Sequence, residues 1–192
     1  MGRTKAEIAE FARRARMARG EEFSSKSSEN SREILDDIPE EKLDLYAKVY
    51  DIQRANPDCI KVFNWLVYGK EHERLDGKWM VFSTDIDYLN NLCKEAVEKD
   101  LVKEAKFSFS SNEPGGACVA CLYINADDIE GNKKLLKYLL DKGAIRRTKT
   151  GKLYNISFKF DDQTRAKEYG EDFKAKICLA DYLNLETGEF IK

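Results

Sequence analysis

The sequence predicts an α+β domain with one curved antiparallel sheet and long helices on the convex face of that sheet. Two strand-like segments, residues 105–111 and 117–124, are joined by Asn112–Gly116, whose residue types are typical of a hairpin turn. The sheet must therefore contain antiparallel pairing. One amphipathic helical segment precedes this hairpin and another follows it, and each needs to bury one apolar stripe against the sheet.

The first of these helices is predicted from residue 84 to about residue 102. Ser83, Thr84 and Asp85 are typical helix-start residues, and Asp87 would complete a capping box on Thr84. Its apolar stripe is formed by Ile86, Leu89, Leu92, Cys93, Ala96 and Val97. These positions recur at helical spacing, so we expect them to face the sheet.

The second helix is predicted to begin at Asp127 or Asp128, either of which can accept hydrogen bonds from the first turn. Gly143 is the expected stop, because glycine readily adopts the left-handed conformation after a helix. The residues expected to point inward are Ile129, Leu135, Leu136, Leu139 and Leu140.

The remaining elements are predicted from the alternation of apolar and polar residues and from residues, such as proline, that limit helices and strands. A helix is expected between Pro39 and Asn56, and strands at residues 59–68, 78–82 and 153–160. Residues 176–183 fit either a strand or a short helix.

Two domain segments are predicted. Residues 1–33 combine a basic helix with a serine-rich linker, and residues 34–192 form the α+β domain. The basic helix is a solvated appendage in one interpretation and a contact for a protein partner or nucleic acid in the other.

The overall composition is that of a globular protein. The chain has 192 residues, of which 42% are hydrophobic and 35% charged, and its net charge of −2 gives no global attraction for nucleic acid. An anion site must therefore be a local cluster of lysines or arginines. No apolar run reaches the roughly 18 residues of a membrane helix, and no signal peptide is evident, so we expect no membrane association and a cytoplasmic or nuclear location.

Five scattered cysteines predict free thiols in a reducing compartment. Cys118 and Cys121 form a C-x-x-C pattern, but they lie in a predicted strand, where residues three apart point to opposite faces. We therefore expect no metal site there, and no cofactor is indicated.

The predicted strands separate into an apolar and a polar face. Phe107 and Phe109 alternate with polar residues, and Tyr154, Ile156, Phe158 and Phe160 do the same in the later strand. The polar positions are Lys106, Ser108, Ser110, Asn155, Ser157 and Lys159. Two cations among hydroxyl groups could hold an anion on the open face, and the alternative is an ordinary solvated face.

The two tryptophans are either core residues or walls of a pocket. Trp65 lies in an apolar run, whereas Trp79 follows Lys78 at the start of a strand and shares a face with Val81. Lys78 would then lie at the lip of the pocket as a solvated lysine.

Several segments, taken in order, resemble a known family. They are W-L-V-Y-G at 65–69, G-K-W-M-V-F at 77–82, L-V-K-E-A-K-F-S at 101–108, and L-Y-N-I-S-F-K-F-D-D-Q-T at 153–164 followed by Tyr169-Gly170. With the helix and hairpin between them, they resemble the basophilic-leukaemia-expressed-protein family, a domain of unknown function. The resemblance covers about residues 57–184 and implies the fold of the mRNA cap-binding translation initiation factors.

This resemblance also implies roles for particular residues. In cap-binding factors two tryptophans sandwich a methylated guanine, a glutamate reads its edge, and basic residues hold the phosphates. Gly77-Lys78-Trp79 resembles their Gly-Arg-Trp, which implies a phosphate contact at Lys78 and a structural role for Trp79. Lys106 is similar in position to a further basic group, and Trp65 to the second sandwich tryptophan. No Trp-Glu pair and no first sandwich tryptophan are present, so cap binding itself is not expected.

An enzymatic alternative remains open, although the sequence favours a protein without catalysis. His72 lies between two glutamates, and Lys159 lies close in sequence to Asp161 and Thr164, so that a Lys159–Asp161 pair is expected. No nucleophile motif, phosphate loop or metal triad accompanies these residues.

The function predicted from the sequence is therefore non-catalytic binding of a phosphate-bearing ligand, a nucleotide or RNA, on the concave sheet face. The predicted ligand-binding residues are Lys78, Lys106, Lys159, Trp65, Ser108 and Ser110. The alternatives are a protein-interaction adaptor that uses the helical face or the N-terminal helix, and a phosphoryl-directed enzyme that uses Lys159 or His72. A concave face filled by the chain's own C-terminal segment would remove the ligand hypothesis.

Overall fold

The computed structural model describes residues 43–62, 64–69, 75–109, 116–168, 170 and 173–191. The chain divides into two compact units, residues 1–57 and 58–192. The described part of the first unit is the helix α3 (Leu43–Ala55) and the two residues after it, and α3 confirms the helix predicted before Asn56. The predicted basic helix and linker, residues 1–33, lie outside the described residues.

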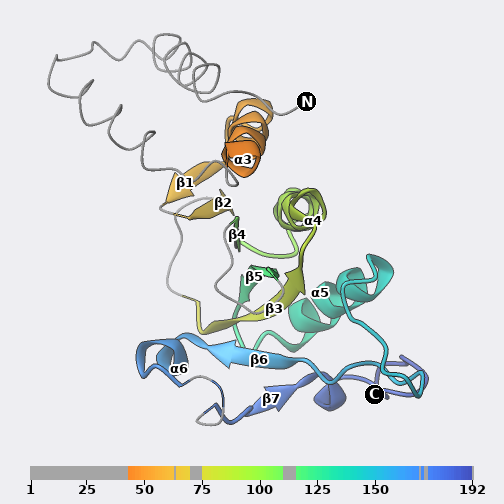
Figure 1. Cartoon of the computed structure of the whole chain (residues 1–192). Helices are drawn as coiled ribbons and strands as arrows, with labels where there is room; N and C mark the ends of the chain where they lie inside the picture. The colour runs from red at the N-terminus through yellow and green to blue at the C-terminus, as the bar shows by residue number, and fades with distance from the viewer. Residues whose placement is uncertain are drawn as a thin grey trace, which may run out of the picture. The chain divides into compact units, whose positions relative to one another are not determined.

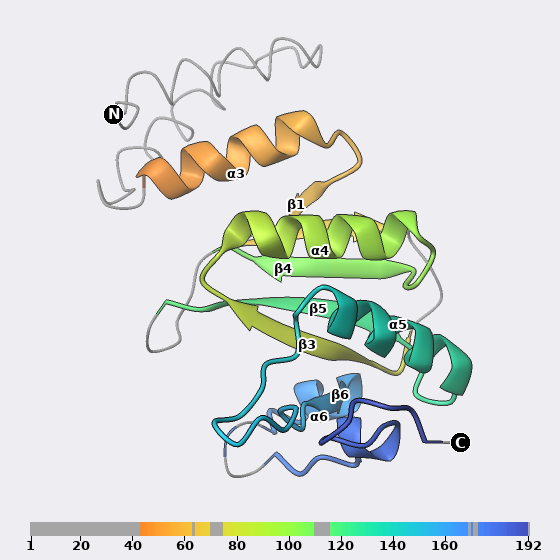
Figure 2. The same ribbon diagram turned by 90° about the vertical axis from the view of Figure 1, so that its right-hand side faces the viewer.

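The second unit is built on a seven-stranded sheet with the order β1-β2-β4-β5-β3-β6-β7 (Figures 1 and 2). Every neighbouring pair of strands is antiparallel. The strands are β1 (Ile60–Val62), β2 (Trp65–Gly69), β3 (Gly77–Ser83), β4 (Glu104–Ser108), β5 (Cys118–Ile124), β6 (Ser157–Phe160) and β7 (Ile177–Cys178). The β4–β5 pair confirms the predicted hairpin.

Two helices, α4 (Ile86–Glu98) and α5 (Ile129–Asp141), lie on the same face of this sheet (Figures 1 and 2). A five-residue helix, α6 (Asp161–Arg165), follows β6 directly, and a 3₁₀ turn, η3 (Leu179–Asp181), follows β7. Residues 176–183 thus contain both a short strand and a helical turn. The predicted α+β class is confirmed.

The start of α4 differs from the prediction. Asp85, not Thr84, is the N-cap, and its carboxylate accepts a hydrogen bond of 3.0 Å from the Tyr88 backbone N–H. The Ser83 hydroxyl oxygen accepts a hydrogen bond from the Asp85 backbone N–H in the turn before the helix. The N-cap therefore lies one residue later than predicted. The predicted capping box between Thr84 and Asp87 is therefore wrong, and the helix ends at Glu98 instead of near Val102. Its predicted stripe is buried, apart from a partly exposed Val97.

Helix α5 follows the prediction more closely. Asp128 is the N-cap and accepts a hydrogen bond of 2.8 Å from the Gly131 N–H. Gly143 adopts φ +66° directly after the helix, which is the conformation expected of a glycine stop. Ile129 is about half exposed because it occupies the first helical position, so its predicted inward orientation is wrong.

Two predicted strands have different limits in the structure. Residues 59–68 form two strands, β1 and β2, which pair with each other through Val62 and Trp65, so the single predicted strand is wrong. The turn between them contains no glycine or proline and therefore gave no breaker signal. Strand β6 covers only residues 157–160, and Tyr154, expected on the apolar face, is 61% exposed.

The core lies between the sheet and the two helices. Trp79 is fully buried there, and its ring packs edge-on against Phe158 at 5.5 Å between centroids. Its indole N–H donates a hydrogen bond of 2.8 Å to the Asn132 side-chain oxygen on α5. Trp79 is a core residue, as expected.

Candidate functional site

The strand register places the predicted ligand residues on the sheet face opposite α4 and α5. Lys78 is paired directly with Tyr123 on one side and with Lys159 on the other. Directly paired residues in antiparallel strands point to the same face. Trp79 points to the helices, so its neighbour Lys78 points to the opposite face, which we call the open face.

The same register places the other predicted residues on the open face. Lys106 is paired with Cys121, which is paired with Met80, two positions from Lys78 on the same strand. Trp65 is paired with Ser108, two positions from Lys106. Five of the six predicted residues therefore share one face, and Ser110 lies outside the described residues.

Lys106 lies between two aromatic rings on this face. Its ammonium nitrogen is 5.1 Å from the ring centroid of Trp65 and 4.9 Å from that of Tyr123. Both distances are within the range of cation–π attraction. Lys106 and Trp65 are partly exposed, so a cation and an aromatic surface are offered together at the surface.

Lys78 does not lie at an open lip, which corrects the prediction of a solvated lysine. Its ammonium group is ion-paired with the Asp161 carboxylate and donates a hydrogen bond of 3.1 Å to the Thr164 hydroxyl. The residue is only 6% exposed. A ligand phosphate at Lys78 would have to displace Asp161.

Lys159 is also buried and does not make the predicted pair with Asp161. Its ammonium group donates a hydrogen bond of 2.8 Å to the Glu168 backbone oxygen and lies 5.2 Å from the Phe173 ring centroid. Burial, and then the positive charge of Lys78, lower the pKa of the Lys159 amine. An amine this enclosed is a poor nucleophile or base for an external substrate, and His72 lies outside the described residues.

The partners of both buried lysines come from one segment, residues 161–173, which follows β6. Its helix α6 lies on the other side of the sheet from α5 (Figure 1). The β3–β6 end of the open face is thus filled by the chain itself, and no ligand is needed to explain Lys78 or Lys159. Among the described residues, no hydrogen bond, ion pair or ring contact joins this segment to Trp65 or Lys106.

Ser108 has a structural role in this arrangement. It is buried, and its hydroxyl oxygen accepts a hydrogen bond of 3.1 Å from the backbone N–H of Val119 on the neighbouring strand. This hydrogen bond therefore joins β4 to β5 beyond the last pair of residues that the two strands align.

Two aromatic residues on the open face were not among the predicted ligand residues. Tyr123 supplies the second ring beside Lys106, and Phe82 is 46% exposed. Phe82 pairs with Val119, three strands away from Trp65 in the order β2-β4-β5-β3. At ~4.8 Å per strand, the strand positions of Trp65 and Phe82 are about 14 Å apart. The alternation of Phe82 with buried Val81 was the sequence signal that could have identified it.

The described cysteines are free thiols, and the two residues of the C-x-x-C pattern are buried strand residues. Burial raises the pKa of Cys118, and it raises that of Cys121 to about 11. Within the described residues, no group of three or more histidine, cysteine, aspartate or glutamate side chains is placed to hold a metal ion.

We expect native Cys121 and Cys93 to react slowly with a thiol reagent at pH 8. Burial raises the pKa of Cys121 to about 11 and also raises the pKa of Cys93, so little of either thiol is the reactive thiolate, and both side chains are buried. Mass spectrometry of time-resolved alkylation should show both protected at least ~100-fold relative to the protein in urea. Partly exposed Cys178 is the internal reference, and labelling of Cys121 as fast as Cys178 would contradict the assigned burial.

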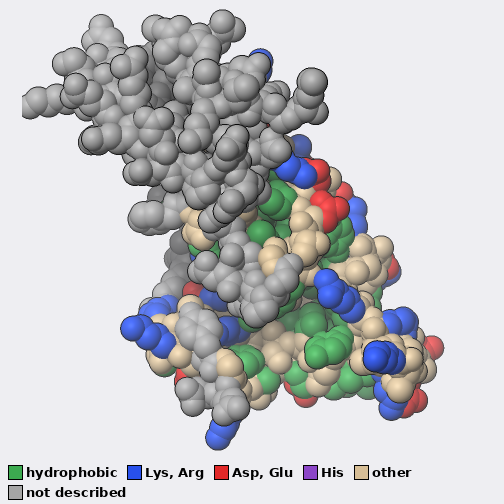
Figure 3. Space-filling model, viewed as in Figure 1, with side chains coloured by type: hydrophobic (Ala, Val, Ile, Leu, Met, Phe, Trp, Pro, Cys, Tyr) green, Lys and Arg blue, Asp and Glu red, His purple; other side chains and the backbone are tan. Residues whose placement is uncertain are grey.

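The outer surface of the helices carries mainly charged pairs. Glu95 is bonded to Lys99 and Lys142, and Lys137 to Asp141. In the view of Figure 3, lysine and arginine side chains are spread among acidic and apolar ones. Of the large apolar side chains exposed in the described residues, only Ile129 belongs to α4 or α5.

Comparison of the chain with protein-family models, curated proteins and solved structures found no match. Within the described part of the chain, each helix is too short or too polar to cross a lipid bilayer.

Proposed function

We propose that the open face binds a phosphate-bearing ligand, a nucleotide or a short single-stranded RNA, without catalysis. The observation that carries this proposal is the Lys106 ammonium group between the Trp65 and Tyr123 rings. Single-stranded nucleic acids are bound by cations that follow the phosphates and by aromatic rings that stack on the bases.

Each residue has a defined role in this proposal. Lys106 forms a charge-assisted contact with a phosphate, and Trp65 stacks on the adjoining base. Phe82, whose strand position is about 14 Å away, would stack on a second base of a longer strand. Because the Lys106 ammonium already occupies the space beside Trp65, a neutral base fits better than the cationic methylguanine of an mRNA cap.

We also propose that the domain has the cap-binding-like form of the α+β class, with a curved sheet and the helices on its convex face. The all-antiparallel sheet and the two 13-residue helices on one face support this proposal. An experimental structure would test it through the curvature of the sheet.

Replacing Lys106 by alanine is expected to weaken binding of a short single-stranded RNA at least ~10-fold, because a charge-assisted contact is lost. Replacing Trp65 by alanine should weaken binding of the RNA by a similar factor, because the base loses its stacking partner. The measurement is a titration with nucleoside mono-, di- and triphosphates and with single-stranded RNA. Trp65 fluorescence reports binding in proteins that retain Trp65. Calorimetry is used to measure binding by the Trp65→Ala variant.

Lys137→Ala is the matched control, since Lys137 is an exposed lysine on α5, across the sheet from the open face. It should leave the affinity unchanged, and the wild-type affinity should fall with salt. Equal effects of the Lys106 and Lys137 replacements, or no saturable binding at millimolar ligand, would refute the proposal.

A further inference from the structure

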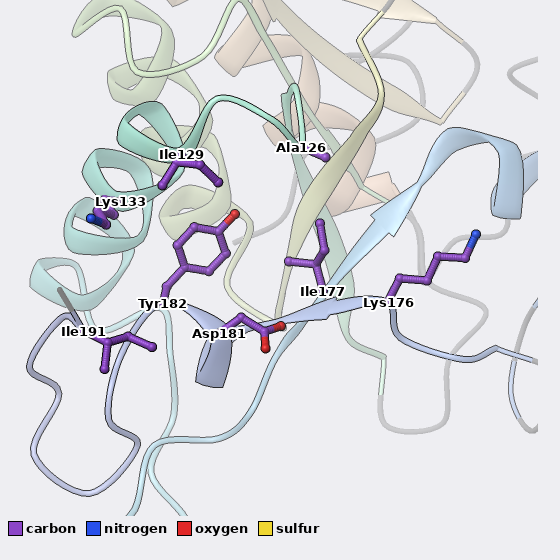
Figure 4. Close-up of a pocket in the computed structure, with 8 residues that line it drawn as sticks. All are labelled: Ala126, Ile129, Lys133, Lys176, Ile177, Asp181, Tyr182 and Ile191. Atoms are coloured by element: carbon purple, nitrogen blue, oxygen red, sulfur yellow. The ribbon is translucent and has the colours of Figure 1, made fainter.

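A pocket of about 370 Å³ lies on the helix side of the sheet, near the start of α5 (Figure 4). Its apolar walls come from Ala126, Ile129, Ile177 and Ile191. Tyr182, which also lines it, packs its ring against Trp79 at 6.0 Å between centroids. Since Trp79 points to the helices and Lys106 points to the open face, the pocket and the proposed nucleic-acid site are separated by the sheet.

The Tyr182 hydroxyl is the unusual feature of this pocket. The residue is only 5% exposed, and within the described part of the chain no hydrogen bond reaches its hydroxyl group. Figure 4 shows the hydroxyl pointing into the space between Ile129 and Ile177. A buried hydroxyl without a partner is costly and therefore rare in folded proteins. A bound ligand would supply the missing hydrogen bond.

The charged residues at the pocket have partners of their own. The Lys133 ammonium is paired with Glu130 at 3.3 Å, and the Asp181 carboxylate accepts a hydrogen bond of 2.7 Å from the Cys178 N–H. The Lys176 ammonium lies 5.7 Å from the Phe160 ring and points away from the Tyr182 hydroxyl in Figure 4. The Tyr182 hydroxyl thus faces apolar walls, and the charges that act on it are the Asp181 and Asp128 carboxylates, so no positive charge there compensates an anion.

We propose that this pocket binds a small, neutral, mostly apolar molecule that exchanges one hydrogen bond with the Tyr182 hydroxyl. The volume is within the range of small-molecule sites, which combine apolar walls with a few placed polar groups. A carboxylate or phosphate is excluded as the preferred ligand class, because burying an ion against these walls is unfavourable. This inference does not depend on the proposed function of the open face.

The test is a titration of Trp65→Phe protein, in which Trp79 is the sole tryptophan and adjoins Tyr182. The probes are benzyl alcohol, toluene and benzoate, which share a ring and differ in the hydrogen-bonding group. We expect saturable binding of benzyl alcohol, with benzoate at least ~10-fold weaker. Replacing Tyr182 by phenylalanine should weaken the binding of benzyl alcohol ~10-fold, because one hydrogen bond is lost. The affinity for toluene should stay unchanged.

The Tyr182→Phe protein should remain folded, because it loses only an unpaired hydroxyl, and its unfolding midpoint should stay equal or rise. Tyr154→Phe, the same change at an exposed tyrosine, is the control and should not affect any probe. The proposal is overturned if benzyl alcohol does not saturate, if benzoate binds more tightly, or if Tyr182→Phe and Tyr154→Phe have equal effects.

Discussion

Replacing Asn132 by alanine is expected to lower the free energy of unfolding by about 3 kcal/mol. Asn132 is fully buried on α5, and its side-chain oxygen accepts the hydrogen bond from the Trp79 indole. Its amide group donates to the backbone oxygens of Asn125 and Asp128 at 2.9 and 2.8 Å. Alanine would leave the indole N–H buried without a partner and would open a small cavity.

The matched control is Asn91→Ala, the same change at an exposed position of α4. It should alter stability by no more than about 0.5 kcal/mol. Urea unfolding followed by circular dichroism gives both values. Equal values for the two variants would mean that the link between α5 and Trp79 does not stabilise the fold.

The elements that were predicted well are those whose signal is local. The apolar stripe of α4, the cap of α5 at Asp128 and its stop at Gly143 each depend on residues within a few positions of one another. The β4–β5 hairpin is also local, because its turn residues lie between the strands. The β1–β2 turn was missed because Asn64 lies in a run of strand-forming residues without a breaker.

The candidate site was predicted less completely because it depends on contacts between distant residues. Alternation predicted that Lys106 and Lys159 share one face, and the family resemblance implied Lys78 as a further ligand residue; the register of the sheet places all three on the same face. Alternation cannot show that Asp161, 83 positions away, would be the partner of Lys78. Nor can it place the pocket at Tyr182, since its walls come from segments separated by about 50 residues.

The ion pair between Lys78 and Asp161 is expected to show a large coupling energy in a double-mutant cycle. Lys78 is almost fully buried, so Asp161→Ala would leave a positive charge without compensation and should cost about 3 kcal/mol. Lys78→Met should cost less, because the Asp161 side chain is 26% exposed and water can solvate it. The double variant should be more stable than Asp161→Ala alone, since methionine fills the site without a charge.

The Lys137–Asp141 pair is the matched control for this cycle. It has the same residue types at 2.9 Å, but both side chains are more than half exposed. Its coupling energy should stay below about 1 kcal/mol, because water screens an exposed pair. Urea unfolding of the four proteins in each cycle gives both coupling energies. If the two are equal, burial does not strengthen the Lys78 pair, Asp161 is held only weakly, and Lys78 becomes available to a ligand phosphate beside Lys106.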